Sequence, residues 1–243
     1  IGLILTYLTV IVIINSFNLI DGVDGLAAGL GIFTTLTFGM YFYVAAHAEY
    51  AALAFAMCGS LLAFLIFNRS PARIFMGDTG SLLIGLINAI LVVQFINIAG
   101  SPGALVPFPA SPAIAIAILI IPLFDTLRVF SIRIFNRRSP FSPDRNHIHH
   151  ILLDRGMSHK AVSFVLIVVN IFFVAVAYLL SFVSINILIP VLITLAFGGF
   201  TLVYLRKPRL MVVATADNED ILQLTKPSRI LPLTPAKKAA EHN

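Results

Sequence analysis

The fold is decided by the stretch at residues 67–97, which reads FNRSPARIFMGDTGSLLIGLINAILVVQFIN. From Gly80 onward this stretch has no charged residue, and it reaches the length of about 17–25 mostly apolar residues that crosses a bilayer. The residues before Gly80 include two Arg and one Asp, which are costly in hydrocarbon and belong at the membrane surface. The stretch therefore predicts a transmembrane helix that begins directly beneath a polar surface motif.

The rest of the chain has the same character. Apolar residues make up 59% of its 243 residues and charged residues 11%, against roughly 45–50% and about 25% in soluble domains. We therefore predict an all-α, polytopic membrane helix bundle, residues 1–206, followed by a polar cytoplasmic tail, residues 207–243. Seven apolar stretches approach or reach the spanning length: 1–17, 26–46, 51–67, 80–98, 112–134, 161–182 and 185–205.

The charges sort to one side of this predicted bundle. Alternation of seven spans places the links 18–25, 68–79 and 135–160 on one face, together with the tail. All sixteen Lys and Arg residues lie there or at the adjoining span ends, and the opposite face carries a single acid, Glu49. The positive-inside rule makes the charge-rich face cytoplasmic. It also explains the net charge of +5 without a nucleic-acid partner.

The first polar motif, residues 18–26, reads NLIDGVDGL. On a helix, Asn18, Asp21 and Asp24 recur every three residues and occupy one side of its end. Gly22 and Gly25 would let a bulky ligand approach the backbone. The alternative is a helix-ending turn with solvated Asp residues. Two Asp and two Gly directly against hydrocarbon favour a functional site.

The second motif lies in the stretch quoted first. Asp78 and Thr79 can cap the helix that follows, and capping alone would justify either residue. However, Gly77 and Gly80 expose backbone, and a helix N-terminus directs partial positive charge toward bound phosphate. Asp78 is also suited to hold a Mg²⁺ that bridges phosphate oxygens. We therefore predict a function for Asp78.

The third motif, residues 142–150, reads SPDRNHIHH and lies in a basic link. Arg145 precedes three clustered imidazoles, His147, His149 and His150. A solvated basic loop explains single Arg and Lys residues but not three His in four positions. Zinc binding is one alternative. Mg²⁺ with carboxylates suits phosphate chemistry better and leaves the imidazoles to bind phosphate or guide protons.

One further pair is ambiguous. Asp125 and Arg128 lie toward the cytoplasmic end of the fifth predicted span, at neighbouring i and i+3 positions of a helix. A structural ion pair inside the bundle and a role in the site are equally compatible with the sequence. The single cysteine, Cys58, lies in an apolar run and excludes a disulfide framework.

Together the three motifs resemble the polyprenyl-phosphate N-acetylhexosamine-1-phosphate transferases, in order and spacing over almost all of residues 1–206. The stretch SPFSPDR at residues 139–145, followed by His-x-His-His, resembles the WecA-type branch, which uses UDP-GlcNAc. The resemblance implies a bacterial cytoplasmic-membrane enzyme that transfers GlcNAc-1-phosphate from UDP-GlcNAc to undecaprenyl phosphate and releases UMP. This step would start a cell-envelope polysaccharide such as the O antigen of lipopolysaccharide or enterobacterial common antigen. Another UDP-N-acetylhexosamine is the nearest alternative substrate.

The resemblance also implies roles for the motif residues. Asp78 would bind Mg²⁺, or Mn²⁺ in its place, and Asp21 would shape the metal and diphosphate site. Asp24, Asn68 and Phe75 would border the nucleotide, with the Phe75 ring facing uracil. The catalytic candidates are Asp21, Asp24, Asp78, His147, His149 and His150, the substrate-binding candidates are Asn18, Asn68, Phe75, Gly77 and Arg145, and the metal ligands are Asp78 and Asp21.

The chain departs from this family in two respects. Members carry an earlier cytoplasmic loop with an adjacent Asp-Asp pair, and this sequence contains no such pair. Members also have ten or eleven spans, whereas we count seven. We therefore expect a fragment of a longer protein that is inactive alone.

Two other functional classes are weaker alternatives. An intramembrane aspartyl protease would use Gly-x-Gly-Asp, but the residue two before Gly77 is Phe75. A transporter would place ionisable groups near mid-membrane at interrupted helices, whereas these groups cluster at one face. The expected partners are UDP-GlcNAc, undecaprenyl phosphate and membrane lipid, and a homo-oligomer is compatible with the sequence.

Overall fold

The computed structural model describes residues 2–137, 139 and 146–205, which form helices and connecting turns without a strand. Arg145 and the tail 207–243 lie outside these residues. The predicted all-α membrane bundle is confirmed: within the described part, six helices can cross a membrane by length and composition, and a bent pair makes a seventh if it is one span. The helices are α1 (Gly2–Ile20), α2 (Leu26–Val44), α3 (Ala48–Asn68), α4 (Gly77–Ala99), α5 (Ser111–Ile118), α6 (Ile120–Phe135), α7 (Ile148–Leu153), α8 (His159–Leu179) and α9 (Ile185–Leu205).

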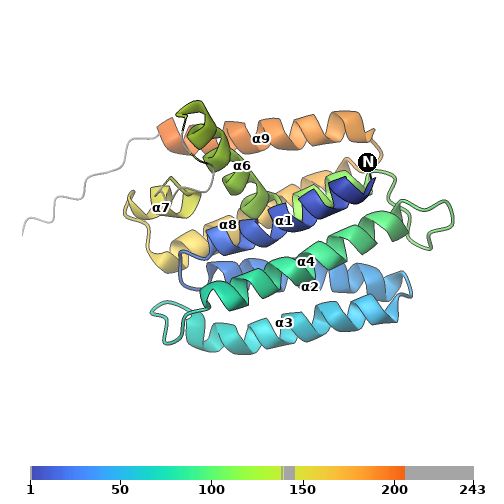
Figure 1. Cartoon of the computed structure of the whole chain (residues 1–243), viewed down its shortest axis with the longest axis horizontal. Helices are drawn as coiled ribbons and strands as arrows, with labels where there is room; N and C mark the ends of the chain where they lie inside the picture. The colour runs from blue at the N-terminus through green and yellow to red at the C-terminus, as the bar shows by residue number, and fades with distance from the viewer. Residues whose placement is uncertain (1, 138, 140–145, 206–243) are drawn as a thin grey trace, which may run out of the picture. The chain divides into compact units, whose positions relative to one another are not determined.

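The long helices pack through buried aromatic and small residues. α1 packs against α4, α2 packs against α3 and α4, and α8 packs against α2 and α5 (Figure 1). The side chains of Phe17, Phe38 and Phe95 are fully buried between them. A Cβ at Gly85 would lie 2.6 Å from the Cα of Ile14, so the α1–α4 crossing requires a residue without a side chain. Small residues at such crossings are typical of helix packing in membranes.

The fifth predicted span, 112–134, is not one straight helix. α5 and α6 meet at Leu119 with a bend of 82°. Pro122 explains the break, because it has no N–H to donate to the carbonyl of Ile118 and its ring would clash there. Asn170 of α8 bonds to the freed backbone instead: its Nδ2 donates to the Ile118 carbonyl at 2.8 Å, and its Oδ1 accepts from the Ile121 N–H at 3.2 Å. The bend gives α6, with Asp125 and Arg128, a direction of its own.

The polar motifs gather at one end of the bundle. The links 21–25 and 69–76 and the segment 146–160 lie together at the left of Figure 1, and we call these residues the charged face. The short link after α2, the loop 100–110 and the link after α8 lie at the opposite end. Helix packing thus brings segments more than 100 residues apart into contact.

Candidate functional site

Two carboxylates lie close together at the charged face. Asp21 directly follows α1, and Asp78 lies in the first turn of α4. Asn18 ties the two helix ends together, because its Nδ2 lies 3.1 Å from Asp78 Oδ1 and 3.0 Å from Ser81 Oγ. Burial, and then the charge of Asp78, raises the pKa of Asp21 to about 6. No described Lys, Arg or His forms an ion pair with either carboxylate, so the pair favours binding of a proton or a cation.

This carboxylate pair fits Mg²⁺ better than zinc. Mg²⁺ in phosphate-transfer sites is held by one or two carboxylates, with waters and substrate phosphates completing its shell. Asp21 and Asp78 supply two such carboxylates. A structural zinc site needs four protein ligands and a catalytic one needs three, and the described residues contain no group of three His, Cys, Asp or Glu side chains placed to hold a metal. The zinc alternative therefore has no support among the described His residues.

Asp24 braces three segments of the charged face. Its Oδ2 accepts from the Ala72 N–H at 3.2 Å and lies 3.5 Å from Nδ1 of His159. Its carbonyl accepts from the Ser163 hydroxyl at 2.9 Å. Asp24 therefore connects the 21–25 link to the 69–76 link and to α8. The sequence did not single out His159 or Ser163, whose partners lie more than 130 positions away.

Asn68 also connects two links of the charged face. It is buried, its Oδ1 accepts from the Gly25 N–H at 3.0 Å, and its Nδ2 donates to the Ile74 carbonyl at 3.0 Å. Gly25 has a φ of 75°, in the left-handed region that favours glycine. Asn68 thus fixes the shape of both links. The contacts of Asp24 and Asn68 with a nucleotide remain predictions.

Phe75 and Gly77 stand at the entrance to α4. The side chain of Phe75 is 81% exposed, so one face of its ring is available for stacking. Gly77 has a φ of 65°, and this conformation directs the chain into α4 immediately before Asp78. The structure thus exposes an aromatic ring three residues before Asp78.

The His motif is attached to α6 through Asp125. Oδ2 of Asp125 lies 2.8 Å from Nδ1 of His147, and its Oδ1 accepts from the Ile148 N–H at 2.8 Å. Arg128 Nη2 also donates to Oδ1 at 3.0 Å. All three side chains are buried. The ion pair of Asp125 and Arg128 is therefore present, and it has a third member, His147, that the sequence did not link to it.

Arg128 makes two further contacts that hold this cluster in place. It donates to the carbonyl of Asn146, and its guanidinium carbon lies 4.5 Å from the ring centroid of Phe200 on α9. Its charge is therefore matched by a carboxylate, a carbonyl and an aromatic face. The N-terminus of α7 is thus held against α6 and α9.

His149 carries the motif to the carboxylate link. It is 1% exposed, and a Cβ at Gly22 would lie 2.2 Å from its Nε2, so glycine permits the contact. Burial lowers the pKa of His149 to about 4. Its ring lies 5.6 Å from that of His147 and 4.3 Å from that of His150, measured between centroids. At neutral pH it is an uncharged imidazole packed against the residue that follows Asp21.

Sequence comparisons relate the chain to known transferases. Residues 1–96 match glycosyl transferase family 4. The chain is 38% identical over 169 residues to a probable undecaprenyl-phosphate N-acetylglucosaminyl 1-phosphate transferase of Bacillus subtilis, covering 70% of this chain and 45% of the relative. The chain thus resembles glycosyl transferase family 4 over residues 1–96 and this transferase over 70% of its own length. The resemblance drawn from the three motifs is thereby confirmed.

Further relatives come from other bacteria. It is 36% identical over 170 residues to the undecaprenyl-phosphate alpha-N-acetylglucosaminyl 1-phosphate transferase of Escherichia coli K12, covering 68% of this chain and 44% of the relative. It is 37% identical over 177 residues to the decaprenyl-phosphate N-acetylglucosaminephosphotransferase of Mycobacterium tuberculosis, covering 66% of this chain and 43% of the relative. The chain spans less than half the length of these relatives.

Two apolar grooves lie between the helices. One, of about 370 Å³, lies between α1, α4 and the α5–α6 bend, with Leu8, Ile96 and Leu119 among its lining residues. The other, of about 250 Å³, lies beneath the His motif between α6, α7, α8 and α9, where Leu152 and Phe200 line it. Both offer apolar walls to a lipid chain.

Proposed function

We propose that the protein transfers GlcNAc-1-phosphate from UDP-GlcNAc to undecaprenyl phosphate, forming a lipid-linked diphosphate sugar and releasing UMP. The observation that carries this proposal is the Asp21–Asp78 pair, closely spaced and without a described cation, beside a neutral buried His149. The names of the relatives support it, because they specify undecaprenyl or decaprenyl phosphate and N-acetylglucosamine 1-phosphate. The choice of UDP-GlcNAc over another UDP-N-acetylhexosamine belongs to this proposal.

The reaction needs little covalent help from the protein. In phosphoryl transfer, positioning and charge neutralisation supply most of the rate enhancement. An oxygen of the lipid phosphate attacks the sugar-bearing phosphorus in line, and the bond from that phosphorus to the UMP oxygen breaks. No protein nucleophile is required.

The chain's own residues have distinct parts in this reaction. Asn18 orients Asp78, and the α4 N-terminus behind Gly77 directs backbone N–H groups toward phosphate. The imidazole of His150, with Arg145, would contact the sugar nucleotide, while the buried His147 and His149 hold their helix in place. Asp21 and Asp78 would hold Mg²⁺, which neutralises the diphosphate and stabilises the leaving UMP when bound. Phe75 would stack on the uracil ring.

The same proposal places the charged face in the cytoplasm of a bacterial cell, at the inner membrane. The absence of Lys and Arg from the opposite links, 45–47, 100–110 and 180–184, supports this orientation. A lipid chain lying in the α1–α4–α5 groove would remain in the bilayer while its phosphate reached the carboxylates. The product would start a cell-envelope polysaccharide.

A transfer assay tests the proposal. Membranes from cells expressing the complete gene receive labelled UDP-GlcNAc, undecaprenyl phosphate and Mg²⁺, and both lipid label and UMP are measured. We expect label in the lipid and one UMP per label, with UDP-glucose as the control that lacks the N-acetyl group. Label from a different UDP-N-acetylhexosamine alone would correct the sugar. If no UDP-sugar releases UMP, the proposed reaction is wrong.

A further inference from the structure

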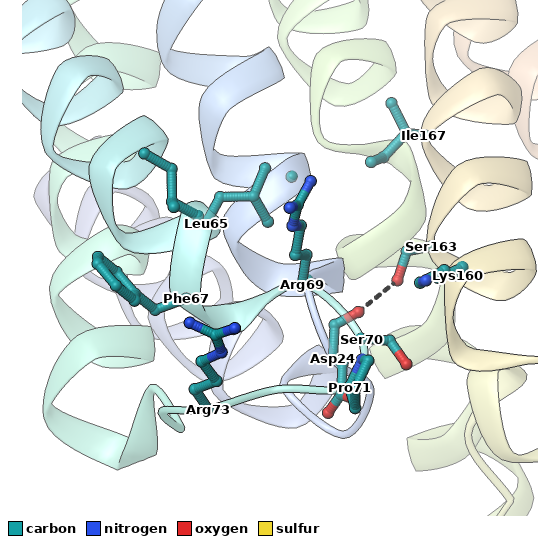
Figure 2. Close-up of a pocket in the computed structure, with 13 residues that line it drawn as sticks. Asp24, Leu65, Phe67, Arg69, Ser70, Pro71, Arg73, Lys160, Ser163 and Ile167 are labelled. Atoms are coloured by element: carbon teal, nitrogen blue, oxygen red, sulfur yellow. Dashed lines mark hydrogen bonds between the residues drawn. The ribbon is translucent and has the colours of Figure 1, made fainter.

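A second cavity, of about 720 Å³, lies at the charged face on the α8 side of Asp24. Its walls come from the first turns of α2, the end of α3, the link after α3 and the start of α8 (Figure 2). It is separate from the carboxylate pair, because its lining includes none of Asn18, Asp21, Asp78 or the three residues of the His motif. Asp24, which the family resemblance places beside the nucleotide, is the one residue that the cavity shares with the predicted site.

The cavity has an excess of positive charge. Arg69, Arg73 and Lys160 line it, against one carboxylate, that of Asp24. Asp24 is already engaged by the Ala72 N–H. Among the described residues, none of the three cations forms an ion pair with a carboxylate. A cavity with three such cations selects an anionic ligand.

The side chains of Arg69 and Arg73 bear on which anionic ligand the cavity would bind. Figure 2 shows Arg69 and Arg73 turned back from the link toward the helices. Arg69, Arg73 and Lys160 are all exposed, so their charges are open to a ligand that enters from outside. The positive-inside rule accounts for basic residues on this face, but it does not account for three of them converging on one cavity. Three cations around one cavity therefore favour an anionic group such as a lipid phosphate.

Much of the remaining wall is apolar, although Ser70 and Ser163 also line the cavity. Leu65, Ile66 and Phe67 come from the last turn of α3, where Ile66 is 63% and Phe67 47% exposed. α2 and α8 pack closely at the bottom of the cavity. A Cβ added at Gly29 would lie only 2.5 Å from Cδ1 of Ile167, so no gap remains between these helices there. A ligand with apolar chains would therefore lay them along the outer side of α3.

We propose that this cavity binds the phosphate head group of an anionic phospholipid of the adjacent leaflet. Arg forms paired hydrogen bonds to phosphate oxygens, and Lys160 adds a third charge from α8. Basic pockets between transmembrane helices at the cytoplasmic side are suited to anionic lipid head groups. The bound lipid would join α3, α8 and the 69–76 link at the place where Asp24 already braces them.

Native mass spectrometry of the complete protein in detergent tests this inference. Phosphatidylglycerol, phosphatidylcholine and undecaprenyl phosphate are titrated separately, and the Kd of each is measured without turnover. We expect phosphatidylglycerol to bind at least about tenfold more tightly than phosphatidylcholine. Arg73→Gln and Lys160→Gln should each weaken it about fivefold, since one cation near an anionic surface contributes about that factor. Arg137→Gln removes an exposed charge outside the cavity and should leave binding unchanged.

Each other outcome would overturn the inference. Equal binding of the two phospholipids, or equal effects of Arg73→Gln and Arg137→Gln, would remove the head-group site. Weaker binding of undecaprenyl phosphate in Arg73→Gln would assign the cavity to that lipid instead, and displacement of phosphatidylglycerol by millimolar inorganic phosphate would assign it to a soluble anion. Asp78→Asn should bind phosphatidylglycerol like the wild type, which separates this result from a failure of the proposed reaction.

Discussion

Two carboxylate clusters lie near the charged face and differ in whether their charges are matched. Asp125 is 1% exposed, and its oxygens are engaged by Arg128, His147 and the Ile148 N–H. Asp21 and Asp78 form no ion pair with a described cation, and the pKa of Asp21 is raised to about 6. A matched buried carboxylate holds structure together, whereas two adjacent unmatched ones attract a proton or a cation. The difference distinguishes residues that hold the site from residues that would act in it.

The largest expected effect is on stability, at the matched cluster. Asp125→Ala leaves Arg128 buried without its carboxylate, and breaking such a pair destabilises a protein by about 3–5 kcal/mol. Denaturant titration of the protein in detergent measures this loss in the free energy of unfolding. Asp154→Ala, at an exposed position just after α7, is the control and should change stability little. Wild-type stability of Asp125→Ala would contradict its role as the anchor of the His motif.

The unmatched cluster should show the opposite pattern. Asp78→Asn preserves size but removes charge, and we expect a loss of about 10²-fold or more in transfer activity if the metal supplies several kcal/mol. Stability should be unchanged or increased, because one of two repelling charges is gone. Transfer assays and unfolding of the same preparations provide both values. Near-normal activity would remove Asp78 from the metal site.

The contact between the two clusters can be tested at Gly22. Gly22→Ala places a Cβ 2.2 Å from Nε2 of His149, and overpacking of this kind usually costs about 1–3 kcal/mol. The double variant Gly22→Ala/His149→Ala removes the clashing ring and should recover part of that loss, as a double-mutant cycle would measure. Gly103→Ala, with nothing within 4 Å of its added Cβ, is the control. Additive effects would mean that the two residues do not touch.

The smallest effect is a pH dependence of cation binding. Because the folded-state pKa of Asp21 is about 6 instead of its usual 3.8, the carboxyl is protonated below that pH and must lose its proton to bind Mg²⁺. The apparent Kd for Mg²⁺ should rise by up to about tenfold for each pH unit below 6 and level off above it. Calorimetric titration between pH 5 and 8 measures this. Asp21→Asn should bind Mg²⁺ more weakly, and its Kd should not change with pH. If the Kd of Asp21→Asn still depends on pH, the proton belongs to another group.

Several properties follow from the sequence because they depend on local composition. The length of each apolar run matches bilayer thickness, and charge cannot lie in hydrocarbon, so the spans and the grouping of the three motifs at one face were predictable. The turn residues Gly25 and Gly77 were also recognisable in their motifs, although their left-handed φ angles were not.

Only the tertiary structure decided which of these residues touch. The 82° bend at Leu119 depends on Asn170, which bonds to the carbonyl that Pro122 leaves free. The roles of Asp24 and Asp125 likewise depend on partners such as His159 and His147 in other helices. Helical periodicity determines the side of a helix on which a residue lies, but not the helix that packs against it. The sequence by itself therefore determined the membrane spans and the face of the site, whereas packing between distant helices decided which carboxylates are matched and which remain free to bind a cation.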